Sequence, residues 1–362
     1  MRALFLTPYL DSLGGGEKYL LDIARAYHDA GYYTALLWPD PYIKKRLIAR
    51  FGAPYGFIDI NSQWHTRNAV SKAQFLAQSD VFFYQPDGSY PFSLAKKNVA
   101  LLQVPNRELL GNDSWFSSIK SSRYIPLYNS RFVKRYFDKH SHHLSLGQVL
   151  YPIVSDNYFI DVPQTHKEKM ILSVGRFFKH LHAKKQEVLI RAFQYGLEKY
   201  PQLFNDYRLV LAGGCKPEDE PYVDSLRKLI HDDARITLHI NASYDELMQQ
   251  YAQAQFYWHA AGYGVSEKES PMSVEHFGIA IVEAMASGAV PIAYEAGGPK
   301  ETIMHEKTGY LFSKRQELAH YTARLIQNPA QYAIMQQAGQ TRAKEHFSYT
   351  ALQQRLQTLN LI

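Results

Sequence analysis

Short apolar runs alternate with longer amphipathic segments along most of this 362-residue chain. That alternation is typical of parallel sheets in which crossover helices join the strands. In the first half it predicts strands at residues 2–7, 34–38, 81–85, 99–104 and 149–151, and helices at 17–30, 71–78 and 131–140. Residues 1–155 are therefore expected to form a Rossmann-like α/β domain.

The pattern lapses at residues 156–168, a polar stretch that contains Pro163, and we expect a linker there. Beyond it the alternation predicts strands at 170–174, 208–212, 236–240, 256–260 and 290–294, and helices at 185–199, 222–231, 244–253 and 278–287. Residues 169–346 should then form a second Rossmann-like domain. We expect the two domains to face each other across a cleft, with a ligand at the carboxyl ends of the strands.

The composition excludes several classes of protein. Hydrophobic residues make up 46% of the chain and charged residues 20%, the reverse of a disordered chain. Cys215 is the only cysteine, so no intrachain disulfide can form and a reducing compartment is favoured. The longest apolar stretch, 277–294, is interrupted by Glu283, and the first residues lack the apolar core of a signal peptide. We expect a soluble, cytoplasmic protein.

The excess of positive charge is confined to one segment. The chain carries 40 Lys and Arg against 34 Asp and Glu, and residues 96–140 hold nine of the first kind against three of the second. His140, His142 and His143 lie at its end. A local basic face favours an anionic partner, such as nucleic acid, a lipid surface or a phosphorylated substrate. The alternative is a solvated surface without a partner.

The most informative residues run from Glu275 to Glu283, from a loop into a predicted helix. The free amides at that helix N-terminus, those of Phe277, Gly278 and Ile279, suit an anionic or hydroxyl-rich ligand. Glu275 and Glu283 would accept hydrogen bonds from hydroxyls on either side of a phosphate, as a sugar diphospho-nucleoside presents them. The alternative is that Glu275 caps the helix and Glu283 is a surface residue.

A second group of residues lies at the end of the first strand of the second domain. Gly175 and Arg176 end that strand, and Lys184 and Lys185 open the following helix. Two cations there suit a diphosphate leaving group, because they bind it more strongly as negative charge develops on the departing oxygen. The alternative is ordinary solvated basic residues.

Together these segments resemble a known family. In chain order they are 174–176, 184–193, 209–214, 275–288 and 291–298, and they are similar to the C-terminal domain of glycosyltransferase family 4. The resemblance implies a GT-B fold. It also implies metal-independent transfer of a sugar from a nucleotide-sugar donor, with retention of the anomeric configuration.

The same resemblance implies roles for single residues. Arg176, Lys184 and Glu275 are the expected catalytic residues, of which the two cations hold the diphosphate and Glu275 faces the sugar hydroxyls. Lys185 could replace Lys184, because the doubled lysine leaves the register ambiguous by one, and Glu283 would bind the ribose. The other expected donor-binding residues are Gly15, Gly16, Gly175, His276, Phe277, Gly278 and Ile279. The expected co-substrate is a UDP- or GDP-linked sugar, with no cofactor and no metal.

The N-terminal half resembles the family more loosely. Gly15 and Gly16 belong to a glycine-rich loop, residues 14–17, that is similar to the loop approaching the donor phosphates. The loop matches neither a P-loop nor the G-x-G-x-x-G pattern, which weakens ATP hydrolysis and dinucleotide binding as functions. Residues 347–362 resemble the final helix that returns to the N-terminal domain.

One position departs from the family pattern. Many members carry a histidine near the reacting sugar where this chain has Gln103, which can donate a hydrogen bond to a hydroxyl but cannot take a proton. We place Gln103 on the acceptor side. His65, His259 and His276 are candidate substitutes, although each is expected to be structural. The loop at 258–273 is expected to line the sugar pocket and to close over the donor.

Two other classes of function compete with a transferase. A nucleic-acid-binding protein would use the basic segment and the tyrosines, but no recognition motif accompanies the charge. A GT-B enzyme that is not a transferase, such as a nucleotide-sugar epimerase, would share the fold. We favour a transferase that acts on a glycan or lipid-linked acceptor and binds no nucleic acid. Residues 96–140 would then draw it to an anionic membrane surface.

Overall fold

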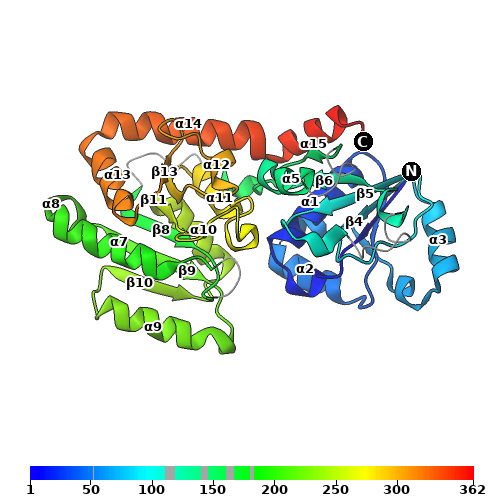
Figure 1. Ribbon diagram of the computed structural model, residues 1–362, viewed down its shortest axis with the longest axis horizontal. Helices are drawn as coiled ribbons and strands as arrows, with labels where there is room; N and C mark the ends of the chain where they lie inside the picture. Colours follow the sequence, from blue (N-terminus) through cyan, green and yellow to red (C-terminus); the bar gives the residue numbers. More distant parts are fainter. Residues whose placement is uncertain (52, 111–118, 140–145, 160–166, 180–182) are drawn as a thin grey trace. The chain divides into compact units, whose positions relative to one another are not determined.

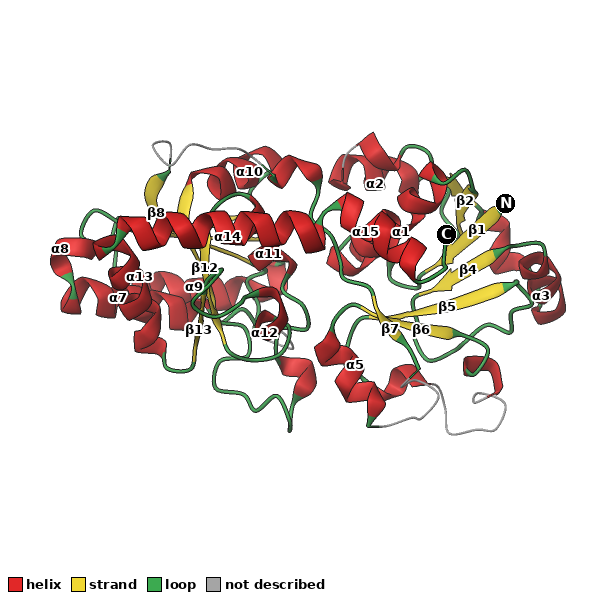
Figure 2. Ribbon diagram, turned by 90° about the horizontal axis from the view of Figure 1, so that it is seen from above, coloured by secondary structure: helices red, strands yellow, loops and turns green. Residues whose placement is uncertain are grey.

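The computed structural model describes residues 1–51, 53–110, 119–139, 146–159, 167–179 and 183–362. Within them the chain folds into two compact units (Figure 1): unit 1 comprises Met1–Ile153 and Tyr349–Ile362, and unit 2 comprises Val154–Ser348. Each unit has one sheet with helices on both of its faces (Figure 2). The predicted fold class, two Rossmann-like α/β domains, is confirmed. Of the linker predicted at 156–168, residues 160–166 lie outside the described residues.

Unit 1 is built on a seven-stranded parallel sheet in the order β3-β2-β1-β4-β5-β6-β7. Its strands are β1 (Arg2–Leu6), β2 (Tyr33–Leu36), β3 (Asp59–Ile60), β4 (Val81–Tyr84), β5 (Lys97–Leu102), β6 (Ile125–Tyr128) and β7 (Gln148–Val149). Its helices include α1 (Gly15–Asp29), α2 (Ile43–Phe51), α3 (Ala69–Ala77), α5 (Arg131–Asp138) and α15 (Tyr349–Thr358). Strand β1 is a continuous apolar run because helices cover both faces of the sheet, and Ala3, Leu4 and Phe5 are fully buried.

Unit 2 is built on a six-stranded parallel sheet in the order β10-β9-β8-β11-β12-β13. Its strands are β8 (Glu168–Val174), β9 (Arg208–Gly213), β10 (Ile236–Ile240), β11 (Ala254–His259), β12 (Val290–Tyr294) and β13 (Tyr310–Phe312). Its helices include α7 (Gln186–Lys199), α8 (Pro201–Phe204), α9 (Glu220–Ile230), α10 (Tyr244–Gln253), α11 (Ile279–Ala286), α12 (Pro299–Thr302), α13 (Arg315–Gln327) and α14 (Pro329–Phe347). The central strands β8 and β11 are neighbours, so the loops at their carboxyl ends meet at one edge of the sheet.

Helix α15 belongs to unit 1, although the long helix before it, α14, belongs to unit 2. The Tyr349 hydroxyl donates a hydrogen bond to the Asp29 carboxylate at 2.5 Å, and the Arg25 guanidinium lies 4.0 Å from the centre of the Tyr349 ring. Three leucines from the end of the chain are buried in the core of unit 1: Leu352, Leu356 and Leu361. The last residues of the chain therefore complete the core of its first unit.

Two glycines lie at the end of β9: Gly213 is its last residue, and Gly214 follows it. Only Gly213 is tightly packed. A Cβ on Gly213 would lie 2.0 Å from the carbonyl oxygen of Gly175, whereas one on Gly214 would meet only Asn241 Oδ1, at 3.8 Å. The amide of Gly175 donates to the carbonyl of Ala212 at 2.9 Å, so the backbone after β8 is fixed where it approaches β9. Glycine at position 213 permits this approach.

We predict that Gly213→Ala lowers the free energy of unfolding by about 2 kcal/mol, because the added methyl group forces two backbone segments apart. The midpoint of thermal unfolding should fall by roughly 4–8 °C. Gly214→Ala is the matched control, and its midpoint should stay close to that of the parent. Equal midpoints for the two variants would contradict the close approach of β8 and β9.

Candidate active site

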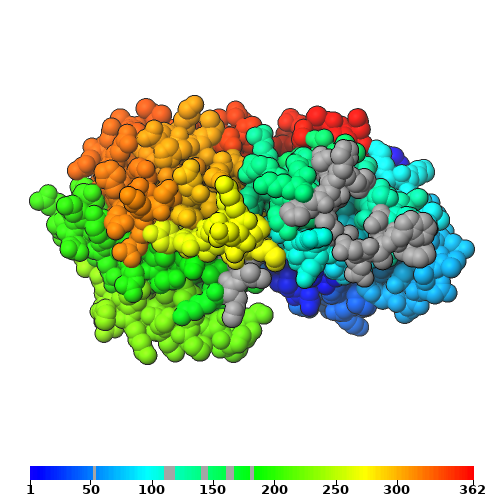
Figure 3. Space-filling view, viewed as in Figure 1, coloured from blue at the N-terminus to red at the C-terminus, as the bar shows by residue number. Residues whose placement is uncertain are grey.

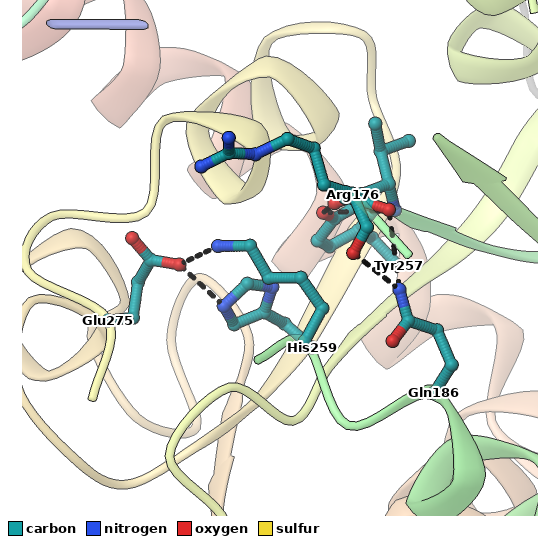
Figure 4. A network of polar contacts seen from close by, with 8 residues as sticks. Arg176, Gln186, Tyr257, His259 and Glu275 are labelled. Atoms are coloured by element: carbon teal, nitrogen blue, oxygen red, sulfur yellow. Dashed lines mark hydrogen bonds and ion pairs between the residues drawn. The ribbon is translucent and has the colours of Figure 1, made fainter. Parts of the chain in front are cut away.

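The loop between β11 and α11 places Glu275 at the centre of the site. Its Oε2 accepts a hydrogen bond from Lys184 Nζ at 2.5 Å and another from His259 Nε2 at 3.1 Å (Figure 4). The exposed fractions of the Lys184 and Glu275 side chains are 21% and 15%, so the ion pair lies largely out of water. Two of the residues predicted from the sequence, Lys184 and Glu275, are thus in direct contact.

The ionisation of Glu275 is set by its two partners. Burial alone would raise the pKa of Glu275, but the charge of Lys184 and the hydrogen bond from His259 outweigh it and hold the pKa well below its ordinary value. Burial lowers the pKa of His259, although Glu275 opposes this effect. Glu275 is therefore ionised and His259 neutral at neutral pH. Because a carboxylate only accepts hydrogen bonds, Nε2 of His259 carries the hydrogen.

The backbone between β8 and α7 fixes Lys184. A Cβ on Gly175 would lie 2.5 Å from Lys184 Cγ, so the absence of a side chain there lets the lysine stem pack on the backbone. The side-chain amide of Gln186 donates, through Nε2, to the backbone carbonyl oxygens of Gly175 at 3.3 Å and Arg176 at 3.2 Å. Its own oxygen accepts from the Tyr222 hydroxyl at 2.9 Å. Gln186 has no expected role from the sequence alone, yet this buried side chain holds the turn together.

The other two predicted cations take different positions. Arg176 is exposed, its guanidinium lies 4.8 Å from the centre of the Phe178 ring, and it extends toward the side of the site on which Glu275 lies (Figure 4). Lys185 is the N-cap of α7 in the left-handed conformation, with φ of 56°. In the part of the chain that the structure describes, Lys184 and not Lys185 pairs with Glu275.

Helix α11 starts one residue after Gly278, whose φ of 89° is in the left-handed region that favours glycine. The amides of Gly278 and Ile279 make no hydrogen bond with the described residues. The side chains of His276 and Phe277 are buried. The backbone amides of Gly278 and Ile279 are thus available to a ligand at the helix N-terminus.

The second glutamate of the pair, Glu283, lies in the middle of α11. Its Oε2 accepts a hydrogen bond from the Tyr251 hydroxyl at 2.9 Å, and the side chain is half-buried. The alternative that Glu283 is a plain surface residue does not fit this environment, and Glu275 with its ion pair is not a simple helix cap.

A loop at the surface of unit 2, yellow in Figure 3, precedes Glu275. Glu267 in this loop accepts hydrogen bonds from the Gly297 amide at 2.7 Å and from Lys300 Nζ at 2.6 Å. The amide of Gly298 donates to the Glu275 carbonyl at 2.8 Å. The segment after β12 therefore supports both the loop and the backbone that carries Glu275. The sequence pattern predicts that the loop lines a sugar pocket but does not single out Glu267.

In unit 1 the predicted glycines and Gln103 lie together. Helix α1 begins at Gly15, two residues earlier than the sequence predicts, because Glu17 Oε2 accepts a hydrogen bond from the Gly14 amide at 2.8 Å and so satisfies the backbone at the helix N-terminus. The side-chain amide of Gln103 donates, through Nε2, to the backbone carbonyl oxygen of Gly16 at 3.1 Å. His65 lies elsewhere in the unit, with Nε2 3.4 Å from the carbonyl oxygen of Leu37.

The residue that sequence reasoning missed is His259 as a partner of Glu275. The two residues are 16 positions apart, and no local pattern joins them. The available signal was the period of two along β11, which places Tyr257 and His259 on the same face of the strand. Their rings stack with centroids 6.3 Å apart.

The sequence model of the family Glycosyl transferases group 1 matches residues 155–342, more than half of the chain, and the chain therefore belongs to this family. The GDP-Man:Man(3)GlcNAc(2)-PP-Dol alpha-1,2-mannosyltransferase of Dictyostelium discoideum is 35% identical over 179 residues, which are 47% of this chain and 32% of that protein. The Homo sapiens protein of the same name is 33% identical over 211 residues, 53% of this chain and 40% of that protein. The matched part thus spans less than half of the length of these relatives.

Solved structures are similar over the whole chain. Anabaena HepE in complex with UDP has a TM-score of 0.75 and 20% identity and covers 100% of both chains. Sucrose-phosphate synthase from Thermosynechococcus elongatus has a TM-score of 0.69 and 16% identity, and covers 99% of this chain and 98% of that one. At this identity the likeness concerns the fold, and the predicted GT-B fold is confirmed.

Two kinds of feature are absent from the described residues. None of the helices there is long and apolar enough to cross a membrane. No group of three or more His, Cys, Asp or Glu side chains among the same residues is arranged to hold a metal ion.

We predict that Lys184→Met lowers the free energy of unfolding at pH 7 by about 3 kcal/mol, because it leaves a largely buried carboxylate without its cation. The pKa of Glu275 is depressed in the folded chain, so the pair stabilises above the ordinary pKa of a glutamate and this stabilisation is lost as the pH falls through the folded-state pKa. The difference from the parent should therefore shrink in acid. Urea unfolding at a series of pH values measures it.

Lys185→Met is the matched control for this experiment, because it removes the neighbouring charge without touching Glu275. Lys185→Met should lower the free energy of unfolding only slightly, and this loss should not depend on pH in the acid range. A pH-independent loss for Lys184→Met, or the same loss for both variants, would contradict the ion pair.

Proposed function

We propose that this chain is a retaining glycosyltransferase of family 4, which transfers a sugar from a nucleotide-diphosphate sugar to a hydroxyl acceptor without a metal. The observation that carries the proposal is the Glu275 carboxylate, held ionised and largely buried by Lys184 and His259. An ionised carboxylate binds sugar hydroxyls, and the cation beside it binds phosphate. A site that combines the two suits a sugar joined to a diphosphate.

The roles proposed for single residues follow the same chemistry. Arg176 and Lys184 hold the diphosphate, together with the amides of Gly278 and Ile279 at the positive end of α11. Glu275 binds hydroxyls of the transferred sugar, and Glu283 binds the ribose. The glycine loop at 14–17 approaches the phosphates, and Gln103 lies on the acceptor side. No cofactor takes part besides the nucleotide-sugar co-substrate.

In the proposed step the bond between the anomeric carbon and the diphosphate oxygen breaks, and the nucleoside diphosphate leaves with the bonding electrons. The acceptor hydroxyl oxygen bonds to the anomeric carbon on the same face of the sugar. Its proton passes to the departing phosphate oxygen, so no protein base is needed and Gln103 is sufficient in place of a histidine. Arg176 and Lys184 stabilise the charge that develops on the leaving group.

The relatives suggest which donors to test first. The curated relatives are named for GDP-mannose and for a dolichol-linked acceptor, and Anabaena HepE has been solved in complex with UDP-glucose. We therefore propose a UDP- or GDP-linked hexose as donor and a glycan or lipid-linked acceptor.

We predict that Glu275→Gln lowers kcat/KM roughly 10- to 150-fold, the cost of losing a hydrogen bond to a charged group. The assay follows release of nucleoside diphosphate from GDP-mannose and UDP-glucose. Glu198→Gln, an exposed position on α7, is the control and should match the parent. Donor binding is checked separately by thermal shift, since a ligand at 100 times its dissociation constant stabilises by about 2.7 kcal/mol. No shift with any UDP-, GDP- or ADP-sugar would refute the proposal.

We also propose that unit 1 binds an anionic membrane surface from the cytoplasmic side. Two segments that contact each other, 89–96 and 119–125, combine basic and apolar groups. The Arg123 guanidinium lies 5.4 Å from the centre of the Phe92 ring, and Lys120 Nζ donates to the carbonyl of Ser89 at 3.0 Å. Four large apolar side chains are exposed there: Phe92 and Leu94 at 45%, Ile125 at 42% and Ile119 at 39%.

This combination of charge and apolar side chains suits a lipid surface better than a nucleic acid, because it offers groups for both headgroups and acyl chains. In the predicted basic segment, Asp113, His140, His142 and His143 lie outside the described residues. The proposal therefore rests on Lys120, Arg123 and the apolar side chains around them.

We predict that the doubly substituted variant Lys120→Glu, Arg123→Glu binds vesicles with 30% phosphatidylserine at least about 30-fold more weakly than the parent at low salt, since each basic residue near such a surface contributes about 1 kcal/mol. The control carries the same change of charge at Lys45 and Arg50 on α2 and should bind like the parent. Vesicle co-sedimentation measures binding. Equal losses in the two variants would indicate net charge alone and would contradict a defined membrane face.

A further inference from the structure

Two hydrogen-bond donors, Lys184 and His259, contact the same oxygen of Glu275, and they come from different elements of unit 2. Lys184 precedes α7, whereas His259 is the last residue of β11. Both donate to Oε2, while Oε1 accepts no hydrogen bond from the residues that the structure describes. Figure 4 shows the second oxygen turned away from His259. Oε2 is therefore held by two hydrogen bonds, whereas Oε1 is left to accept hydrogen bonds from a ligand.

The sheet itself fixes the ring of His259. The side chain of His259 is 2% exposed and stacks on Tyr257 at an interplanar angle of 17°. The Tyr257 hydroxyl donates to the carbonyl of Val174 at 3.2 Å and accepts from the amide of the same residue at 3.3 Å. Because Val174 ends the neighbouring strand β8, the imidazole is held by the two central strands. Lys184, by contrast, reaches Glu275 through four flexible methylene groups.

A histidine is a costly residue for this position unless its polar atoms are used. Burial keeps the imidazole neutral, and an apolar side chain of similar size would fill the same space without desolvating a ring nitrogen. The charged group that His259 contacts is Glu275. The hydrogen bond is therefore the physical reason for a histidine at the end of β11.

Lys184 and His259 also differ in whether they bind phosphate. Under the proposed function Lys184 binds the donor diphosphate, and a phosphate competes with Glu275 for the same ammonium group. His259 carries no charge and does not attract phosphate in this way. It can hold Oε2 throughout the reaction while Lys184 changes partner.

We infer that His259 is a positioning residue for Glu275: its Nε2–H anchors Oε2, so that Oε1 faces the hydroxyls of the donor sugar. The inference rests on the proposed function and adds to it a residue outside the motif pair Glu275 and Glu283. It concerns the sugar and not the nucleotide. Loss of His259 should therefore spare the binding of a free nucleoside diphosphate.

A double-mutant cycle tests this inference on the full chain. His259→Leu removes the hydrogen-bond donor, His259→Gln keeps an N–H at a similar reach, and each is combined with Glu275→Ala, which removes the acceptor. The exposed His320→Leu is the control. We measure kcat and KM for release of nucleoside diphosphate from GDP-mannose and UDP-glucose, together with the affinity for free GDP and UDP.

His259→Leu should lower kcat/KM at least about 10-fold, as expected for a hydrogen bond to a charged group. His259→Gln should recover most of this loss. In the Glu275→Ala background, which has no acceptor for the His259 N–H, His259→Leu should change kcat/KM less than about 2-fold, because the effect passes through the carboxylate. The affinity for the free nucleoside diphosphate that the parent binds should stay at the parent value in His259→Leu and His259→Gln, which leave the Lys184–Glu275 ion pair in place.

Equal losses in the two backgrounds, or a His259→Gln variant as slow as His259→Leu, would overturn the inference and leave His259 a packing residue. These outcomes differ from failure of the proposed function. If the parent bound neither donor and released no nucleoside diphosphate, the function itself would be wrong, and the inference with it. If the parent were active and His259→Leu matched it, only the inference would be wrong.

Discussion

The ion pair between Lys184 and Glu275 is the interaction on which the arrangement of the site depends. It joins the segment after β8 to the loop before α11, although the two residues are 91 positions apart. Because both side chains are largely withdrawn from water, either charge would be strongly unfavourable without the other. The glycines around the pair follow from it. Gly175 leaves room for the lysine stem, and a Cβ on Gly297 would lie 2.1 Å from the carbonyl oxygen of Glu275.

Most of the fold could be predicted because central parallel strands are long apolar runs. The bounds predicted for β8, β9 and β11 differ from the observed ones by one or two residues. Strand β6 was missed because Pro126, in its middle, is unfavourable in a strand interior. Strands β3 and β13 were missed as well, because runs of two and three residues carry no periodic signal. Helix α1 begins inside a glycine run that is typical of a loop, and the cap formed by Glu17 overrides that preference.

The candidate site could be predicted only where its residues are close together in the sequence and form a recognisable motif. The spacing from Glu275 to Glu283 and the cations after β8 pointed to one ligand, and the structure places Lys184 on Glu275. Two features required three-dimensional information. The left-handed backbone of Lys185 separates the two lysines, which the doubled sequence left equivalent. The contact of His259 with Glu275 depends on how a strand end and a distant loop meet, and no spacing encodes that.

The membership of α15 in unit 1 has a consequence for how the chain is made. Synthesis proceeds from the N-terminus, and domains generally fold as units in that order. Here Leu352, Leu356 and Leu361, which fill the core of unit 1, emerge only after every residue of unit 2. Unit 1, although begun first, therefore still lacks part of its core while unit 2 is synthesised. For the time it takes to translate unit 2, the surface of α1 that α15 later covers is open to chaperones.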